Sequence, residues 1–212
     1  QIELAFLSHA HFDHSNGFGE FFRLNTTAPL YLSADCKEDC YGRRFIFSKY
    51  IGIKRGYADL YKDRLIYTKG LTAVADGIYL LPHGDGDYSI YGRKNGLFRK
   101  ENRKWVYDSF RHEQSLVIRT QKGLVIFNSC CHTGADNIIN EVAEAFSDEK
   151  ILALIGGFHL YKSTDEDVLT LSRKIKETGI DKIYTGHCTG DKAKELLAPH
   201  TNIHFFHTGD EI

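Results

Sequence analysis

The stretch "LSHAHFDHSNGF" (residues 7–18) places His9, His11, Asp13 and His14 close together, directly behind an apolar run. Four titratable side chains that follow a buried strand are costly to remove from water unless they bind a metal ion or form many hydrogen bonds. Residues two apart in an extended segment share a side, so His9 and His11 can bind one ion together. Asp13 and His14 follow in the turn, where they can reach a second ion. The spacing therefore predicts a metal site.

Length and composition set the broad class of the protein. The chain has 212 residues, 42% hydrophobic side chains and a formal charge of −1, which suits one globular domain with a sizeable core. This charge offers no general attraction for nucleic acid or membrane. No run reaches the roughly 18 apolar residues of a membrane helix. Five cysteines without a disulfide framework favour the cytoplasm.

The chain opens in the middle of a strand-like run and contains no methionine. We therefore expect the chain to be incomplete at its N-terminus. The sequence has no internal repeat and no low-complexity linker, so we expect a single domain over residues 1–212.

Apolar strand-like runs alternate with segments of helical period, which indicates a layered α/β fold. The expected strands span 2–8, 28–33, 77–82, 115–120, 123–128, 151–156, 182–186 and 202–207. The expected helices span about 136–146, 164–178 and 191–197. Ser163 and Glu166 have capping-box spacing, and Gly179 supplies a stop for the second helix.

One polar segment, about 84–108, breaks this alternation. It is rich in glycine and in basic residues, and it predicts a long hairpin or surface loop. Its charges favour a solvated surface over a clamp for an anionic substrate.

Four expected strands carry, at their C-terminal ends, side chains of the kinds that bind metal ions (His, Cys and Asp), which we call metal-type side chains. These side chains are His9, His11, Asp13 and His14; Cys130, Cys131 and His132; His159; and His187 and Cys188. If the four strands are parallel neighbours, their ends meet at one edge of a sheet, where α/β folds place their sites. Isolated histidines are more often structural, and this applies to His83, His112, His200, His204 and His207. Cys36 and Cys40 lie four apart, with the spacing of one helix face, and we interpret them as core side chains.

The opening motif resembles the His-x-His-x-Asp-His signature of the metallo-β-lactamase superfamily. The later stretches "GLVIFNSCCHTGADN", "IGGFHL" and "TGHCTG" resemble the branch named after 7,8-dihydropterin-6-methyl-4-(β-D-ribofuranosyl)aminobenzene-5′-phosphate synthase. The resemblance covers residues 2 to about 190. It implies a four-layer αβ/βα sandwich, here without the opening strands of that fold.

The resemblance also implies a ligand set. His9 and His11 would bind one ion, and Asp13 and His14 would bind another together with His187. Most of the superfamily has a bridging aspartate after the strand that ends here at Asn128. This chain has "SCCH" instead, so either Cys130 replaces the aspartate or the bridge is missing.

The function implied is that of a metal-dependent hydrolase, or a related transferase, acting through a metal-bound hydroxide. The substrate would be small and anionic, and a phosphorylated or pterin-type compound fits the branch name. Asp13 and His159 are the catalytic candidates, Asp13 for the water proton and His159 for an oxyanion or leaving group. One or two divalent ions are expected, zinc first, with manganese or iron as alternatives. A nuclease, and a non-catalytic or redox metal-binding protein, are the other readings, and the oligomeric state stays open.

Two histidines compete to be the third ligand of the first ion. His112 has the position that most of the superfamily uses, just before the strand 115–120. His132 stands at a strand's C-terminal end and lies within a longer stretch that matches the branch. We favour His132. If the strands 115–120 and 123–128 form an antiparallel hairpin, both histidines can approach the metals.

Overall fold

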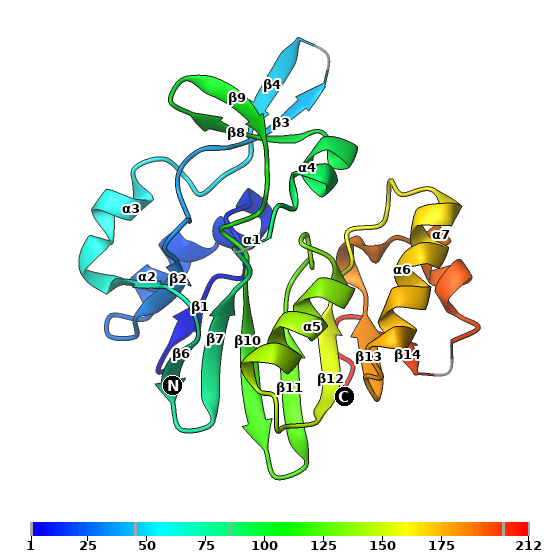
Figure 1. Cartoon of the computed structure of the whole chain (residues 1–212). Helices are drawn as coiled ribbons and strands as arrows, with labels where there is room; N and C mark the ends of the chain where they lie inside the picture. Colours follow the sequence, from blue (N-terminus) through cyan, green and yellow to red (C-terminus); the bar gives the residue numbers. More distant parts are fainter. Residues whose placement is uncertain (1, 45, 85, 201, 212) are drawn as a thin grey trace. The chain divides into compact units, whose positions relative to one another are not determined.

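The computed structural model describes residues 2–44, 46–84, 86–200 and 202–211. The chain divides by its internal contacts into two compact units. Unit 1 contains Gln1–Thr72 and Pro82–Gln114, and unit 2 contains Ala73–Leu81 and Ser115–Ile212 (Figure 1). A single domain over 1–212 stays a prediction.

Unit 2 is built on a seven-stranded sheet with the order β14-β13-β12-β11-β10-β7-β6. Its strands are β6 (Thr72–Ala75), β7 (Ile78–Pro82), β10 (Gln114–Thr120), β11 (Gly123–Phe127), β12 (Ile151–Gly156), β13 (Lys182–Thr185) and β14 (Ile203–Phe205). Strands β11 to β14 run parallel, as their mostly apolar sequences predict. Strands β10 and β11 form the predicted antiparallel hairpin, with Leu116 opposite Phe127.

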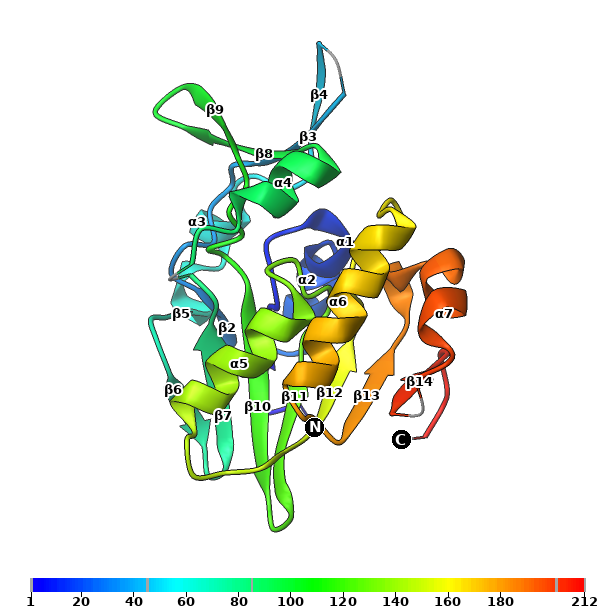
Figure 2. The same cartoon turned by 45° about the vertical axis from the view of Figure 1, so that its right-hand side comes forward.

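Three helices connect the parallel strands of this sheet. They are α5 (Ala135–Ala145), α6 (Asp165–Glu177) and α7 (Asp191–Leu197), close to the predicted ranges. Helices α5 and α6 lie over the same face of the sheet in both views (Figures 1 and 2). The N-cap of α6 is Thr164, whose hydroxyl accepts a hydrogen bond from the backbone N–H of Asp167. The capping-box prediction on Ser163 was therefore one residue early.

The core of unit 2 forms where these helices cover the sheet. Leu124, Ile126, Leu154 and Ile183 are fully buried in the sheet, and they belong to one apolar cluster with the buried residues of the helices. Burial on this scale holds the C-terminal ends of β11, β12 and β13 in fixed positions.

Unit 1 contains two smaller sheets. The first is parallel, with the order β1-β2-β5, and consists of β1 (Ala5–Phe6), β2 (Leu30–Ser33) and β5 (Leu65–Thr68). The second is antiparallel, with the order β4-β3-β8-β9, and consists of β3 (Cys40–Arg44), β4 (Phe47–Tyr50), β8 (Leu97–Glu101) and β9 (Lys104–Tyr107). The β8–β9 hairpin agrees with the hairpin or surface loop predicted for 84–108, whereas the pairing of β3 and β4 with it was not predicted, because these strands are short and lack a clear apolar alternation.

The helices of unit 1 are short. They are α1 (Phe12–Ser15), α2 (Phe18–Leu24), α3 (Tyr57–Leu60), the 3-10 turn η1 (Lys62–Arg64) and α4 (Ser89–Asn95). The segment 84–108 thus contains α4 as well as the β8–β9 hairpin. Cys36 and Cys40 do not share a helix, as their spacing suggested, because Cys40 begins β3. Both cysteines are buried, which confirms them as core side chains.

The first predicted strand belongs to a different sheet from the other three that carry metal-type residues. β1 pairs in parallel with β2, with Ala5 opposite Leu30, whereas β11, β12 and β13 are neighbours in unit 2. The expectation that all four strand ends meet at one edge of one sheet was therefore wrong for β1. Local sequence predicts that a strand exists, but long-range pairing decides which sheet it joins.

Within the described ranges, no helix is both long enough and apolar enough to cross a membrane.

Candidate metal centre

The His-x-His-x-Asp-His motif leaves β1 and enters helix α1 within unit 1. His11 is the N-cap of α1 and has extended backbone angles, φ −77° and ψ 149°. The extended backbone places the buried rings of His9 and His11 together, with centroids 4.8 Å apart. The ring of His14 lies 4.4 Å from that of His9. Three imidazoles therefore cluster as the spacing predicted.

Asp13 occupies the first turn of α1, on the solvent side of this cluster. Its carboxylate is about half exposed, and Oδ2 lies 3.5 Å from Nε2 of His14. A carboxylate next to an imidazole, open to water, is suited to binding an ion or accepting a proton.

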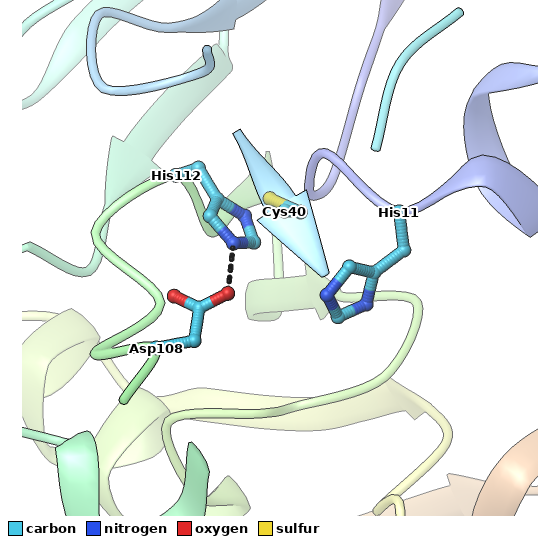
Figure 3. Close-up of side chains that lie close together, drawn as sticks. All are labelled: His11, Cys40, Asp108 and His112. Atoms are coloured by element: carbon cyan, nitrogen blue, oxygen red, sulfur yellow. Dashed lines mark hydrogen bonds and ion pairs between the residues drawn. The ribbon is translucent and has the colours of Figure 1, made fainter. Parts of the chain in front are cut away.

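His112 makes contacts different from those of the motif histidines. It is fully buried, and its Nδ1 accepts a hydrogen bond of 3.1 Å from the backbone N–H of Ala10, between the two motif histidines. Its Nε2 lies 3.1 Å from Oδ2 of Asp108 (Figure 3). Because both ring nitrogens are occupied, His112 positions the motif's backbone and has no lone pair for an ion.

Asp108 completes this arrangement. Its Oδ1 accepts a hydrogen bond from the backbone N–H of Phe110, which has a left-handed φ of 56°. Burial alone would raise the pKa of Asp108, but the ring of His112 outweighs it and lowers that pKa to about 2. Asp108 is therefore a buried carboxylate at neutral pH. The sequence had no motif that marked it.

Cys40 and His11 lie near this pair, and the four candidate ligand atoms are within 4.8 Å of one another (Figure 3). Burial raises the pKa of the Cys40 thiol well above its ordinary value. Both ring nitrogens of His112 already have hydrogen-bond partners, Ala10 and Asp108. The geometry of Asp108 and His112 thus favours a supporting role beside the motif.

Unit 2 places its metal-type residues in three loops that follow β11, β12 and β13. Each loop holds a non-glycine residue with a left-handed backbone: Cys131 at φ 46°, His159 at φ 49° and His187 at φ 47°. Such conformations cost on the order of 1–3 kcal/mol each and cluster at functional sites. Three of them at adjacent strand ends favour a site here.

Two of the predicted residues in these loops are in contact. The rings of His132 and His159 have centroids 4.2 Å apart, and His132 is buried. Cys188, beside His187, has an unusual environment. A hydrogen bond from Cys130 lowers the pKa of Cys188 to about 5; burial opposes the shift, and His159 and His187 support it. The sequence marked Cys188 only as a strand-end residue and assigned it no role.

The donor set of unit 1 fits a divalent transition ion. Three clustered imidazoles and one carboxylate are the ligands that zinc, manganese and iron accept in proteins. The ligand roles of His9, His11, Asp13, His14, His132 and His187 stay predictions.

Comparison with known proteins gives the fold class first. No family model matches the chain. A crystal structure of a metal-dependent hydrolase of the β-lactamase superfamily is similar, with a TM-score of 0.79 and 26% identity over 98% of this chain and 78% of that one. A variant of the CmlA β-hydroxylase has the same fold, with a TM-score of 0.53 and 11% identity over 98% of this chain and 43% of its own. The α/β fold of the metallo-β-lactamase superfamily is thus confirmed.

A relative of similar sequence identifies the family within this superfamily. It is 7,8-dihydropterin-6-methyl-4-(β-D-ribofuranosyl)-aminobenzene-5′-phosphate synthase of Methanocaldococcus jannaschii, which is 30% identical over 92% of this chain and 69% of its own. The chain belongs to the family of this synthase, within the metallo-β-lactamase superfamily.

Proposed function

We propose that this protein is a metal-dependent enzyme, a hydrolase or a related transferase, that acts on a small anionic substrate. The observation that carries the proposal is the buried pair His9 and His11, with Asp13 and His14 on the helix that follows. Burying these polar side chains behind an apolar strand costs free energy, and binding a divalent ion as its ligands would offset that cost.

The proposed ligands of the first ion are His9, His11 and His132, and those of the second are Asp13, His14 and His187. Zinc is the first choice of metal, and manganese and iron are the alternatives. A bound ion of this kind lowers the pKa of a water molecule to about 7, which supplies a nucleophile at neutral pH. Cys130 is the candidate to replace the superfamily's bridging aspartate.

Two side chains have proposed catalytic roles. The exposed carboxylate of Asp13 accepts the proton of the attacking water. The ring of His159, held in a loop by a left-handed backbone, donates a hydrogen bond to the developing oxyanion or a proton to the leaving group.

The substrate class is supported by the family. The relative's name describes a dihydropterin methyl group joined to an aminobenzene that carries a ribofuranosyl phosphate. We propose a phosphorylated, pterin-type small molecule as the substrate. No nucleic-acid or membrane partner is proposed, and the cytoplasmic location stays a prediction.

The hydrolase is tested with bis(p-nitrophenyl) phosphate as the substrate. Protein purified without chelator, protein stripped by chelator and protein reloaded with Zn²⁺ are compared, with the double variant His9→Ala/His11→Ala beside them. Turnover that disappears on stripping and returns on reloading supports the proposal. Turnover equal in all four samples contradicts it, and faster cleavage of DNA would favour the nuclease. A loaded protein without any turnover, but with a reversible redox signal, would favour the non-catalytic reading.

The transferase is the second candidate, and the 30% identical synthase favours it. Its test supplies a 7,8-dihydropterin with a leaving group on the 6-methyl carbon, together with 4-(β-D-ribofuranosyl)aminobenzene 5′-phosphate. Mass spectrometry then detects the joined product. Metal-dependent product supports the transferase, and metal-dependent consumption of the pterin by water alone supports the hydrolase.

A further inference from the structure

Three consecutive loops of unit 2 place two thiols and an imidazole together. Candidate ligand atoms of Cys130, His159 and Cys188 all lie within 4.8 Å of one another. The loops follow β11, β12 and β13, which are parallel neighbours in the sheet. Each residue is therefore delivered by a separate strand end, as in other α/β sites.

Hydrogen bonds hold the Cys130 loop in place. The side-chain oxygen of Asn128 accepts from the backbone N–H of Cys130 at 3.1 Å and of Cys131 at 2.8 Å. The amide nitrogen of Asn128 donates to the hydroxyl of Ser115 at 3.0 Å. These hydrogen bonds to Asn128 hold the loop that carries Cys130.

The other two loops are bonded to each other. The backbone N–H of His159 donates to Sγ of Cys188 at 3.2 Å, and that of Phe158 donates to the hydroxyl of Thr189 at 3.1 Å. Gly157 allows the approach, because a Cβ there would lie 2.7 Å from the same sulfur. The sulfur position is thus defined by the backbone on both sides.

One ring nitrogen of His159 is unused. Its Nδ1 is buried and has no hydrogen-bond partner among the described residues. A buried ring nitrogen without a partner is costly, and a metal ion is one group that satisfies it. Two thiolates and one imidazole form a ligand set that zinc uses in proteins, with a fourth position open.

We infer that Cys130, His159 and Cys188 form a Cys₂His site for a thiophilic divalent ion, Zn²⁺ in the first place. Zinc–sulfur bonds of about 2.3 Å place tetrahedral ligand atoms about 3.8 Å apart, so a small contraction of the present cluster completes the site. The inference goes beyond the proposed function, which assigns no sulfur ligand to either catalytic ion except as a replacement for an aspartate. It does not require His9 or His11.

The site is compatible with a catalytic role for His159. A histidine that binds a metal through one nitrogen keeps an N–H on the other, which remains able to donate to an oxyanion. A neighbouring ion fixes the tautomer of the ring and its orientation.

Cobalt spectroscopy tests the inference without any assay of activity. Chelator-stripped protein is titrated with Co²⁺, and the sulfur-to-cobalt charge-transfer band in the near ultraviolet is recorded. The band should appear in the wild type and in His9→Ala/His11→Ala. It should fall to about half in Cys130→Ser and in Cys188→Ser, and vanish in the double variant. Cys131→Ser is the matched control, because Cys131 is adjacent to Cys130, is buried, and is outside the group.

Several outcomes would overturn the inference. These are a folded wild type without the band, a band that survives in the Cys130→Ser/Cys188→Ser double variant, or a band that disappears in His9→Ala/His11→Ala while the cysteine variants keep it. The last result leaves the proposed function intact, whereas loss of turnover in His9→Ala/His11→Ala with the band retained separates the two sites.

A second measurement uses the wild type alone, in case the serine variants fail to fold. Mass spectrometry follows alkylation of Cys188, which is partly accessible, with and without Zn²⁺. Zn²⁺ should slow the reaction at least tenfold. Equal rates, or an intact protein lighter by two hydrogens because the two thiols have formed a disulfide, would contradict the site.

Discussion

The two units present metal-type side chains in different ways. In unit 1, one short stretch from His9 to His14 supplies a strand end, an N-cap and a helix turn, so the cluster is local. In unit 2, Cys130, His159 and Cys188 come from three loops that only the parallel sheet brings together. A local cluster can be recognised from spacing alone, whereas an assembled one depends on the strand order.

The cysteines show the same difference between the units. In unit 1, Cys36 packs in an apolar cluster, and burial raises its pKa to about 12. In unit 2, Cys188 stands at a strand end, where a thiol and two histidines hold its pKa near 5. A thiol's surroundings, rather than its distance from another cysteine in the sequence, decide whether it can bind a metal.

The largest expected effect is on the local cluster of unit 1. The double variant His9→Ala/His11→Ala should lose metal affinity by about 1000-fold, or about 4 kcal/mol, because it removes two ligands of one ion. Isothermal titration of the stripped proteins with Zn²⁺ measures this, with Cys188→Ser added to every protein so that the Cys130–His159–Cys188 site does not contribute to the binding. The control is His207→Ala, which removes an exposed histidine. Equal affinity in the double variant and the control would show that the motif is structural.

The second effect separates His132 from His112. His112→Ala should lower the free energy of unfolding by about 3 kcal/mol, because the buried carboxylate of Asp108 and the N–H of Ala10 lose their partner. It should keep its metal, while His132→Ala should lose metal affinity by 10- to 100-fold or more. Urea unfolding and zinc titration of both variants decide this. If His132→Ala keeps its affinity and His112→Ala does not, the assignment is reversed.

A third effect concerns pH and Asp108. The pKa of Asp108 is about 2 in the folded protein and about 4 in the unfolded chain, so the unfolded chain takes up its proton first as pH falls. Asp108 therefore contributes on the order of 2 kcal/mol above pH 4, and this contribution is lost between about pH 4 and pH 2. Asp108→Asn should be less stable at pH 7 and should show a flatter decline over that window. Parallel curves of unfolding free energy against pH would contradict the lowered pKa.

The smallest effect is expected from the basic segment of unit 1. Among the basic residues of the segment 84–108, Arg99 is not exposed. It is buried, and its guanidinium forms an ion pair with the carboxylate of Asp39, with Nη2 and Oδ2 2.8 Å apart. The exposed residues Arg93, Lys94 and Lys100 remain. Replacing these three with Gln should raise KM for an anionic phosphodiester about twofold and weaken its dependence on salt. Unchanged kinetics would assign the segment to a solvated surface.

Much of unit 2 could be predicted from the sequence. The runs 123–128, 151–156 and 182–186 are apolar and regularly spaced with helices, so their parallel order followed from the α/β pattern. In unit 1, the β8–β9 hairpin lies within the segment 84–108, for which a hairpin or surface loop was predicted. Its pairing with β3 and β4 into one antiparallel sheet could not be predicted, because these strands are short and carry no clear alternation.

The candidate metal centre could be predicted only in part. The motif from His9 to His14 has spacing that few structural segments share. Asp108 and the pairing of His112 with it had no such signal, because their roles depend on hydrogen bonds to a segment about a hundred residues away. Cys130, His159 and Cys188 were predicted at strand ends that meet at one edge, and the parallel order of β11, β12 and β13 brings them together. Their grouping as one sulfur-rich ligand set was not predicted, because it depends on the conformations of three loops.

The central claim is that this chain holds a divalent transition metal through its histidine motif. Its most direct test is elemental analysis of protein purified without chelator, beside His9→Ala/His11→Ala prepared in the same way. We predict at least one equivalent of zinc, manganese or iron in the wild type and a clear loss in the variant. Less than about a tenth of an equivalent of any transition metal in the wild type, in a folded sample that also fails to take up Zn²⁺, would contradict the claim.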